Sequence, residues 1–201
     1  MGCVMTDTDR IATLTELASR CAQPHGLTVE AVTLTPAGRR RVLAVVVDTD
    51  ISGLEADDAT SRVESVDMDA VAEVTRDFAA ALDEVDVMGE MPYTLEVTSP
   101  GIGRRLERFD QFRRNVGRKL RVRFAAAGVE VPDGLSVDAA GVVEATGRLL
   151  SVTREALEIA PDPIRSSPGA KPKPVADVLV PLASITHANV EVDFASHEED
   201  N

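Results

Sequence analysis

Apolar residues recur every three or four positions in two stretches of the chain, and this spacing predicts two amphipathic helices. The first begins at Thr6 or Asp7, either of which is a suitable N-cap, and ends at residues 24–26. The second begins after Asp67, and its apolar face consists of Met68, Val71, Thr75, Phe78, Leu82 and Val85. Each helix therefore has one side that must pack against another element.

Runs rich in β-branched residues predict three strands around these helices. Residues 27–36 and 40–48 are joined at Ala37 and Gly38, which indicates a hairpin, and residues 93–98 form the third run. The second run is apolar almost throughout, as is typical of a strand covered on both faces. The order α-β-β-α-β predicts a two-layer sandwich, which we assign to an N-terminal α/β domain over residues 1–105.

One polar and acidic stretch, residues 49–66, interrupts this pattern. It shows no sustained period, so we expect a loop, with a short helix capped by Ser61 and Glu64 inside it.

The second half of the chain has a different pattern. Residues 106–116 place Leu106, Phe109, Phe112 and Val116 on one side of a short helix, which we assign as the linker. Beyond it, residues 117–201 contain short strand-like runs of the kind that form a small antiparallel β-barrel, at 118–124, 141–152, 156–160, 176–182 and 188–194. The predicted fold class is therefore α+β.

Loops and a tail complete the predicted second domain. Glycine and proline punctuate residues 128–141, and five prolines fall within residues 161–174, so neither stretch is expected to form regular structure. The acidic end SHEEDN is expected to be disordered.

The distribution of charge is more informative than its total. The net charge of -13 argues against a general affinity for nucleic acid, yet residues 104–123 carry nine basic residues against two acidic ones. Aromatic residues make up only 3% of the chain, so base-stacking platforms are not expected. Two cysteines cannot form a disulfide framework, and no apolar run is long enough for a membrane span, which indicates a cytoplasmic protein without a membrane partner.

The sequence shows no pattern that indicates catalysis. Its histidines are isolated, and it lacks the cysteine pairs of a metal site and the glycine-rich motifs of a nucleotide site, so we expect no metal and no cofactor. Ser99 with His187 as its base is a conceivable nucleophile, but Ser99 lacks the flanking glycines of a nucleophile elbow. We therefore expect a protein that is not an enzyme and has no small-molecule substrate.

The stretch TSPGIGRRL, residues 98–106, carries the most specific local signal. Pro100 ends the preceding strand, and Gly101 and Gly103 permit a tight turn whose amides can face an anion. Arg104 and Arg105 follow with forked donors that suit phosphates or carboxylates. The same residues equally suit a tight inter-domain turn with solvated arginines.

The run YTLEVTSPGIGRRL closely resembles the signature YxLEVSSPGxDRPL of the bacterial ribosome maturation factor P (RimP) family. Residues 68–86, 113–124 and 180–192 resemble other parts of that family, and the likeness covers most of residues 8–194. Gly103 and Arg105 stand where the family usually has Asp and Pro, which removes one possible Asp–Arg pair. The loops at 49–66, 128–141 and 161–174 are longer than the family requires.

The resemblance implies a KH-like first domain followed by an Sm-like or SH3-like barrel, in a monomer. It implies an assembly factor that binds the small (30S) ribosomal subunit and assists late folding of 16S rRNA and incorporation of small-subunit ribosomal protein twelve. The alternative is a stand-alone KH/Sm-like RNA-binding module. The residues that we expect to contact RNA or a protein partner are Ser99, Pro100, Gly101, Arg104, Arg105, Arg108, Arg114, Arg118, Lys119 and Arg121.

Overall fold

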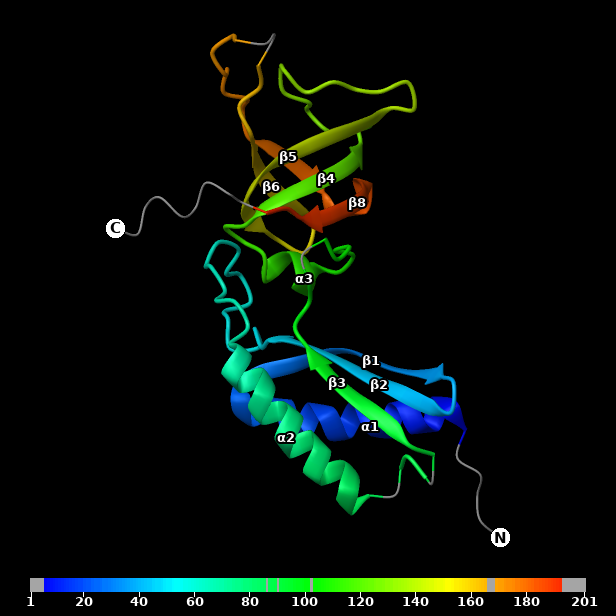
Figure 1. Ribbon diagram of the computed structural model, residues 1–201. Coiled ribbons are helices and arrows are strands. Elements are labelled where there is room, and N and C mark those ends of the chain that lie inside the picture. The colour runs from blue at the N-terminus through cyan, green and yellow to red at the C-terminus, as the bar shows by residue number, and fades with distance from the viewer. Residues whose placement is uncertain (1–5, 86, 90, 102, 166–168, 193–201) are drawn as a thin grey trace. The chain divides into compact units, whose positions relative to one another are not determined.

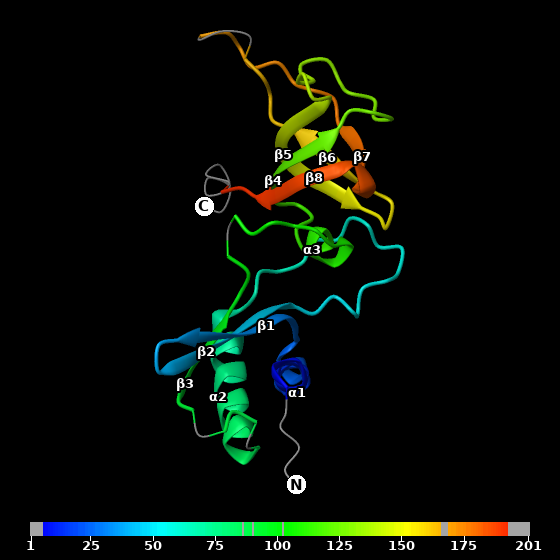
Figure 2. The same cartoon turned by 90° about the vertical axis from the view of Figure 1, so that its right-hand side faces the viewer.

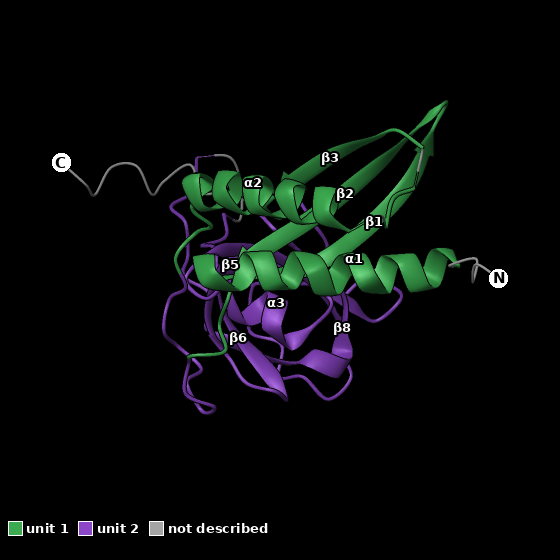
Figure 3. Ribbon diagram, turned by 90° about the horizontal axis from the view of Figure 1, so that it is seen from below, with its two compact units in different colours: residues 1–53, 64–100 green, residues 54–63, 101–201 purple. Residues whose placement is uncertain are grey.

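The computed structural model describes residues 6–85, 87–89, 91–101, 103–165 and 169–192. The chain divides into two compact units, of which the first comprises residues 1–53 and 64–100 and the second comprises residues 54–63 and 101–201. Figure 3 colours the first unit green and the second purple. The first unit combines helices with strands and the second is built on an antiparallel sheet, so the fold is α+β.

The first unit contains the helices and strands that the sequence pattern predicts. Its elements are α1 (Asp7–Ala22), the 3-10 turn η1 (Gln23–His25), β1 (Leu27–Ala37), β2 (Arg40–Thr49), α2 (Met68–Glu84) and β3 (Tyr93–Thr98). Thr6 caps α1 through a reciprocal capping box with Asp9, and the Asp67 carboxylate caps α2 by accepting from the Asp69 N–H.

The sheet of the first unit has the order β1-β2-β3, with β2 antiparallel to β1 and parallel to β3. Both helices lie along one face of it, as two views show (Figures 1 and 2). Leu43, Val45 and Val47 of β2 are fully buried, and Phe78 of α2 belongs to the same core. Val42, Ala44 and Val46 point to the other face and remain half-buried, so the expectation that this strand is covered on both faces was wrong.

The second unit places a short helix before a five-stranded sheet. Its elements are α3 (Phe109–Arg113), β4 (Lys119–Ala125), β5 (Val142–Val152), β6 (Ala156–Pro161), β7 (Val178–Pro181), the 3-10 turn η2 (Leu182–Ser184) and β8 (Ile185–Val190). The sheet order is β7-β6-β5-β4-β8, and every pair is antiparallel.

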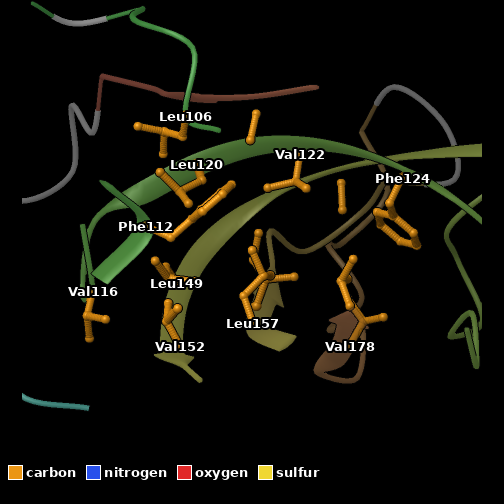
Figure 4. Close-up of a cluster of buried hydrophobic side chains, with 14 of the residues drawn as sticks. Leu106, Phe112, Val116, Leu120, Val122, Phe124, Leu149, Val152, Leu157 and Val178 are labelled. Carbon is orange, nitrogen blue, oxygen red and sulfur yellow. The ribbon is translucent and has the colours of Figure 1, made fainter. Parts of the chain in front are cut away.

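The core of the second unit is built from buried side chains of all five strands. Leu120, Val122 and Phe124 alternate along β4 on its buried side, and Phe112 of α3 packs into the same cluster (Figure 4). At Gly147 a Cβ atom would overlap the carbonyl oxygen of Ala160, so β5 and β6 approach more closely here than a side chain would allow.

Several predicted boundaries differ from the structure. The helix predicted over residues 106–116 spans only Phe109–Arg113, and the last predicted strand begins at Ile185 instead of residue 188. Residues 50–66 contain no helix, so the helix predicted at Ser61 was wrong. The acidic end, residues 196–201, lies outside the described residues.

Candidate functional site

The turn after β3 connects the two units of the chain. Ser99 and Pro100, both half-buried, close the first unit, and Gly101 opens the second. The Arg104 N–H donates to the Gly101 carbonyl at 3.3 Å, which closes a four-residue turn. Gly103 has a φ of 86°, a conformation that favours glycine. The Arg104 amide is therefore used inside the turn.

The next two residues cover one edge of the second unit's sheet. Arg105 forms a bridge with Asn189 of β8, and the Leu106 N–H donates to the Ala188 carbonyl at 2.8 Å. The Arg105 guanidinium donates to the Thr186 carbonyl at 3.0 Å and lies 3.2 Å from a Glu107 carboxylate oxygen. Arg105 is thus held against β8, with its side chain still 56% exposed.

Two arginines around α3 share one carboxylate. Arg108 Nε and Arg114 Nη1 each lie 3.3 Å from an oxygen of Asp110. Burial alone would raise the pKa of Asp110, but the hydrogen bond from Arg108 and the positive charges of Arg108 and Arg114 outweigh it and lower the pKa. Arg108 is exposed, whereas Arg114 is buried and cannot present its guanidinium at the surface.

The neighbouring Arg113, which the sequence analysis did not single out, is 2% exposed and holds residues 54–63. Its Nε donates to the Asp58 carbonyl at 2.8 Å, and its Nη1 donates to the Ser61 carbonyl at 2.5 Å. Its Nη2 lies 3.1 Å from Asp58 Oδ1 as an ion pair, without hydrogen-bond geometry to any described residue. We call residues 54–63 the strap, because they come from between β2 and α2 yet pack on the second unit.

Further contacts fix the strap. The Val152 N–H at the end of β5 donates to the Ala59 carbonyl at 2.9 Å. The Ser61 N–H donates to Asp58 Oδ1 at 2.9 Å, and this bond is the largest cause of the lowered pKa of Asp58. The bond from the Thr60 N–H and the positive charge of Arg113 also lower that pKa. The ionised Asp58 carboxylate therefore organises the strap from within while Arg113 anchors it.

Strand β4 presents basic side chains on its outer face. Lys119, Arg121 and Arg123 alternate with the buried apolar residues of that strand. Each lies close to a carboxylate, at 2.5 Å for Lys119 and Asp162, 3.0 Å for Arg121 and Glu191, and 3.7 Å for Arg123 and Glu144. Arg118, just before the strand, donates to the Asn115 side chain at 3.4 Å. The local excess of positive charge is thus largely balanced by acidic neighbours.

The structure places the predicted contact residues in four groups. Ser99 and Pro100 belong to the first unit, and Gly101, Arg104 and Arg105 lie in the turn and at the β8 edge. Arg108 and Arg114 flank α3, while Arg118 directly precedes β4 and Lys119 and Arg121 lie at its start. Sequence reasoning missed Arg113, because an arginine inside a basic run carries no sign that it is buried.

Among the described residues, no group of three or more His, Cys, Asp or Glu side chains is arranged to hold a metal ion. No helix in the described part of the chain is both long and apolar enough to cross a membrane.

Comparison with known proteins identifies the family. A family model described as "RimP N-terminal domain" matches residues 17–103. The ribosome maturation factor RimP of Kineococcus radiotolerans is 35% identical over 174 residues, which cover 87% of this chain and 73% of that protein. This chain belongs to the RimP family. The RimP of Frankia casuarinae is 36% identical over 182 residues, which cover 88% of this chain and 56% of that longer protein.

Membership of the RimP family extends to the second unit, because an alignment of 174 residues is longer than the whole first unit. The resemblance that rested on the turn at Ser99 and Pro100 is thereby confirmed at the level of the family. The family model also spans residues 54–63, so the strap lies inside the matched region.

Proposed function

We propose that this chain is a cytoplasmic, monomeric assembly factor that binds the immature small (30S) ribosomal subunit and assists its maturation. In this proposal it supports late folding of 16S rRNA and incorporation of ribosomal protein twelve, without covalent catalysis and without a cofactor. The observation that carries the proposal is the similarity to proteins named ribosome maturation factor over 87% of the chain.

The proposal includes the fold families of both units. The first unit is a KH-like sandwich, which two helices on one face of a three-stranded sheet support. The second is an Sm-like or SH3-like barrel, which the five antiparallel strands and the 3-10 turn before β8 support.

The residues that face RNA in this proposal are those of the turn, 99–101, and the accessible basic side chains of the second unit. Arg105, Arg108 and Arg121 are exposed, and Arg104, Arg118 and Lys119 are half-buried, whereas Arg114 is buried and pairs with Asp110. Exposed ion pairs contribute only about 0–1 kcal/mol each, so a phosphate can replace a carboxylate partner at little cost.

A pair of charge reversals tests this surface. Arg104→Glu with Arg105→Glu should weaken binding to the small subunit and flatten its salt dependence, since each lost phosphate contact removes roughly 0.7 to 0.9 from the log-log slope. Arg39→Glu with Arg40→Glu, an exposed arginine pair at the β1–β2 turn, is the matched control. If both pairs change the slope equally, or neither does, the assignment of the turn to RNA is wrong.

The alternative, a stand-alone RNA-binding module, is disfavoured by the charge balance on β4. Each basic side chain on its outer face has a carboxylate within 3.7 Å, which reduces the attraction of this face for free RNA. A salt titration with bare 16S rRNA fragments separates the two functions, because a module binds them tightly by itself and an assembly factor requires the subunit.

Incorporation of ribosomal protein twelve requires contact with that protein. Isothermal calorimetry of the intact chain with it, at low and at near-physiological salt, should detect binding that weakens as salt rises, because acidic and basic surfaces attract by screened charge. Absence of binding at low salt would remove this part of the proposal.

A further inference from the structure

The sheet of the second unit has one covered edge and one open edge. Arg105 and Leu106 pair with β8 and cover that edge. At the opposite end of the sheet, β7 pairs with β6 and, within the described residues, with no strand on its outer side. A groove of about 660 Å³ runs beside β7, between this strand and residues 128–133.

The backbone of Leu179 is directed toward this open side. The Leu182 N–H donates to the Glu155 carbonyl at 2.8 Å, and the register pairs Val180 with Leu157. Because hydrogen-bonded and non-bonded pairs alternate along antiparallel strands, Val180 bonds to β6 and Leu179 turns its N–H and C=O away from it. Among the described residues no backbone bond uses these two groups, so they can pair with an added strand.

The side chains around the groove define what such a strand must carry. Leu179 is 64% exposed at its centre, and the facing loop contributes the apolar side chains of Val129 and Val131. The charged residues among the described groove lining are all acidic, namely Glu130, Asp133 and Asp177. A complementary segment therefore combines apolar residues with lysine or arginine.

A second copy of this chain does not meet these requirements. Head-to-tail pairing would need a free β8 edge, which Arg105 and Leu106 already occupy. Pairing of β7 with β7 of another copy would bring the same carboxylates together, in a chain of net charge -13. The carboxylates also repel the phosphates of RNA, so the occupant is a basic protein segment.

We propose that the open edge of β7 and its acidic groove bind an extended, basic segment of another protein as an additional β-strand. This inference rests on the proposed function, in which a basic ribosomal protein is the partner, and it assigns that partner's contact to backbone pairing at Leu179.

The test uses the intact chain and a synthetic peptide of about ten residues, the length of a long strand, in which lysine and valine alternate. A peptide of equal charge with proline in place of valine is the control for non-specific attraction, because proline has no N–H to pair with the edge. Binding of the first peptide should slow hydrogen exchange at the Leu179 amide, and the proline peptide should leave it unchanged. Equal effects of the two peptides, or no effect at Leu179, would overturn the proposal.

Variants test the groove itself. Glu130→Lys with Asp133→Lys should weaken peptide binding by about tenfold or more, whereas Asp83→Lys with Glu84→Lys, an equal change of charge in the last turn of α2, should have a much smaller effect. Leu179→Ala should also weaken binding while the fold is retained, because the side chain is largely exposed. If both double variants weaken binding equally, the attraction is non-specific and the proposal fails. Because no ribosomal component is present, this failure is distinct from a failure of the chain to bind the small subunit.

Discussion

Replacing Arg113 by alanine should release the strap from the second unit. The guanidinium makes two charge-assisted hydrogen bonds, to the carbonyls of Asp58 and Ser61, and is almost completely buried. Hydrogen bonds to charged groups contribute about 1.5–3 kcal/mol each. The freed carbonyls of Asp58 and Ser61 regain water once the strap opens, because every residue of the strap is half-buried or exposed. We therefore expect the free energy of strap opening to fall by an amount near the lower limit for two such bonds, about 3 kcal/mol in total.

Hydrogen exchange followed by mass spectrometry measures this loss locally. A change of about 3 kcal/mol in the opening free energy corresponds to a roughly hundredfold faster exchange of protected amides in the strap. Arg113→Met separates the contribution of side-chain packing from that of hydrogen bonding, because methionine keeps an apolar stem in the buried site and makes none of the guanidinium hydrogen bonds. Arg113→Met should therefore accelerate exchange in residues 54–63 nearly as much as Arg113→Ala.

Arg121→Ala is the control for this experiment. The Arg121 side chain is 47% exposed and pairs with Glu191, so its removal should lower the free energy of unfolding by less than about 1 kcal/mol. Exchange in the strap should stay unchanged. If Arg113→Ala leaves exchange of residues 54–63 at the wild-type rate, the strap is not held by the guanidinium and the reasoning is refuted.

Three further outcomes follow from the same contacts. Because the pKa of Asp58 is lowered in the folded chain, its carboxylate stabilises the strap fully above the ordinary aspartate pKa of about 4. This stabilisation is lost as the pH falls through the folded-state pKa. Strap exchange, corrected for the intrinsic rate, should therefore accelerate below about pH 4, and Asp58→Asn should abolish that pH dependence. Gly147→Ala should destabilise the second unit by about 1–3 kcal/mol in urea unfolding, because the new Cβ overlaps the Ala160 carbonyl; an unchanged midpoint would contradict this. Residues 101–201 expressed without the strap should show faster exchange near α3 than the intact chain, and equal rates would show that the strap is dispensable.

The first unit could be predicted from the sequence because its signals are local. Thr6 and Asp67 cap the two helices within three residues of the amides they satisfy. Apolar spacing predicts the buried face of α2 only in part, because Met68 and Val85 are exposed and Val74, outside the predicted face, is buried. The hairpin turn at Gly38 likewise has a local cause, since its φ of 65° favours glycine.

The strap could not be predicted because its anchor is not local. Arg113 bonds to the carbonyls of Asp58 and Ser61, which lie 55 and 52 positions away and belong to the backbone, so no side-chain pattern marks them. An arginine in a basic run is also normally solvated, and burial of one requires partners that only the folded chain supplies.

The linker helix predicted over residues 106–116 is shorter at both ends in the structure, and side-chain hydrogen bonds explain its limits. The Gln111 side chain accepts hydrogen bonds from the Glu107 and Arg108 N–H groups, which caps α3 and sets its start at Phe109. The Asn115 side chain donates back to the Gln111 carbonyl near its end. The apolar spacing of residues 106–116 continues beyond both limits because Leu106 and Val116 enter the core from irregular segments.

The central claim is that this chain acts on the small ribosomal subunit, and co-sedimentation tests it most directly. The intact chain is mixed separately with isolated small subunits, isolated large subunits and whole ribosomes, and each mixture is pelleted through sucrose at near-physiological salt. We predict that the chain pellets with small subunits and stays in the supernatant with large subunits. Equal recovery with both subunits, or none with the small subunit, would contradict the proposed function.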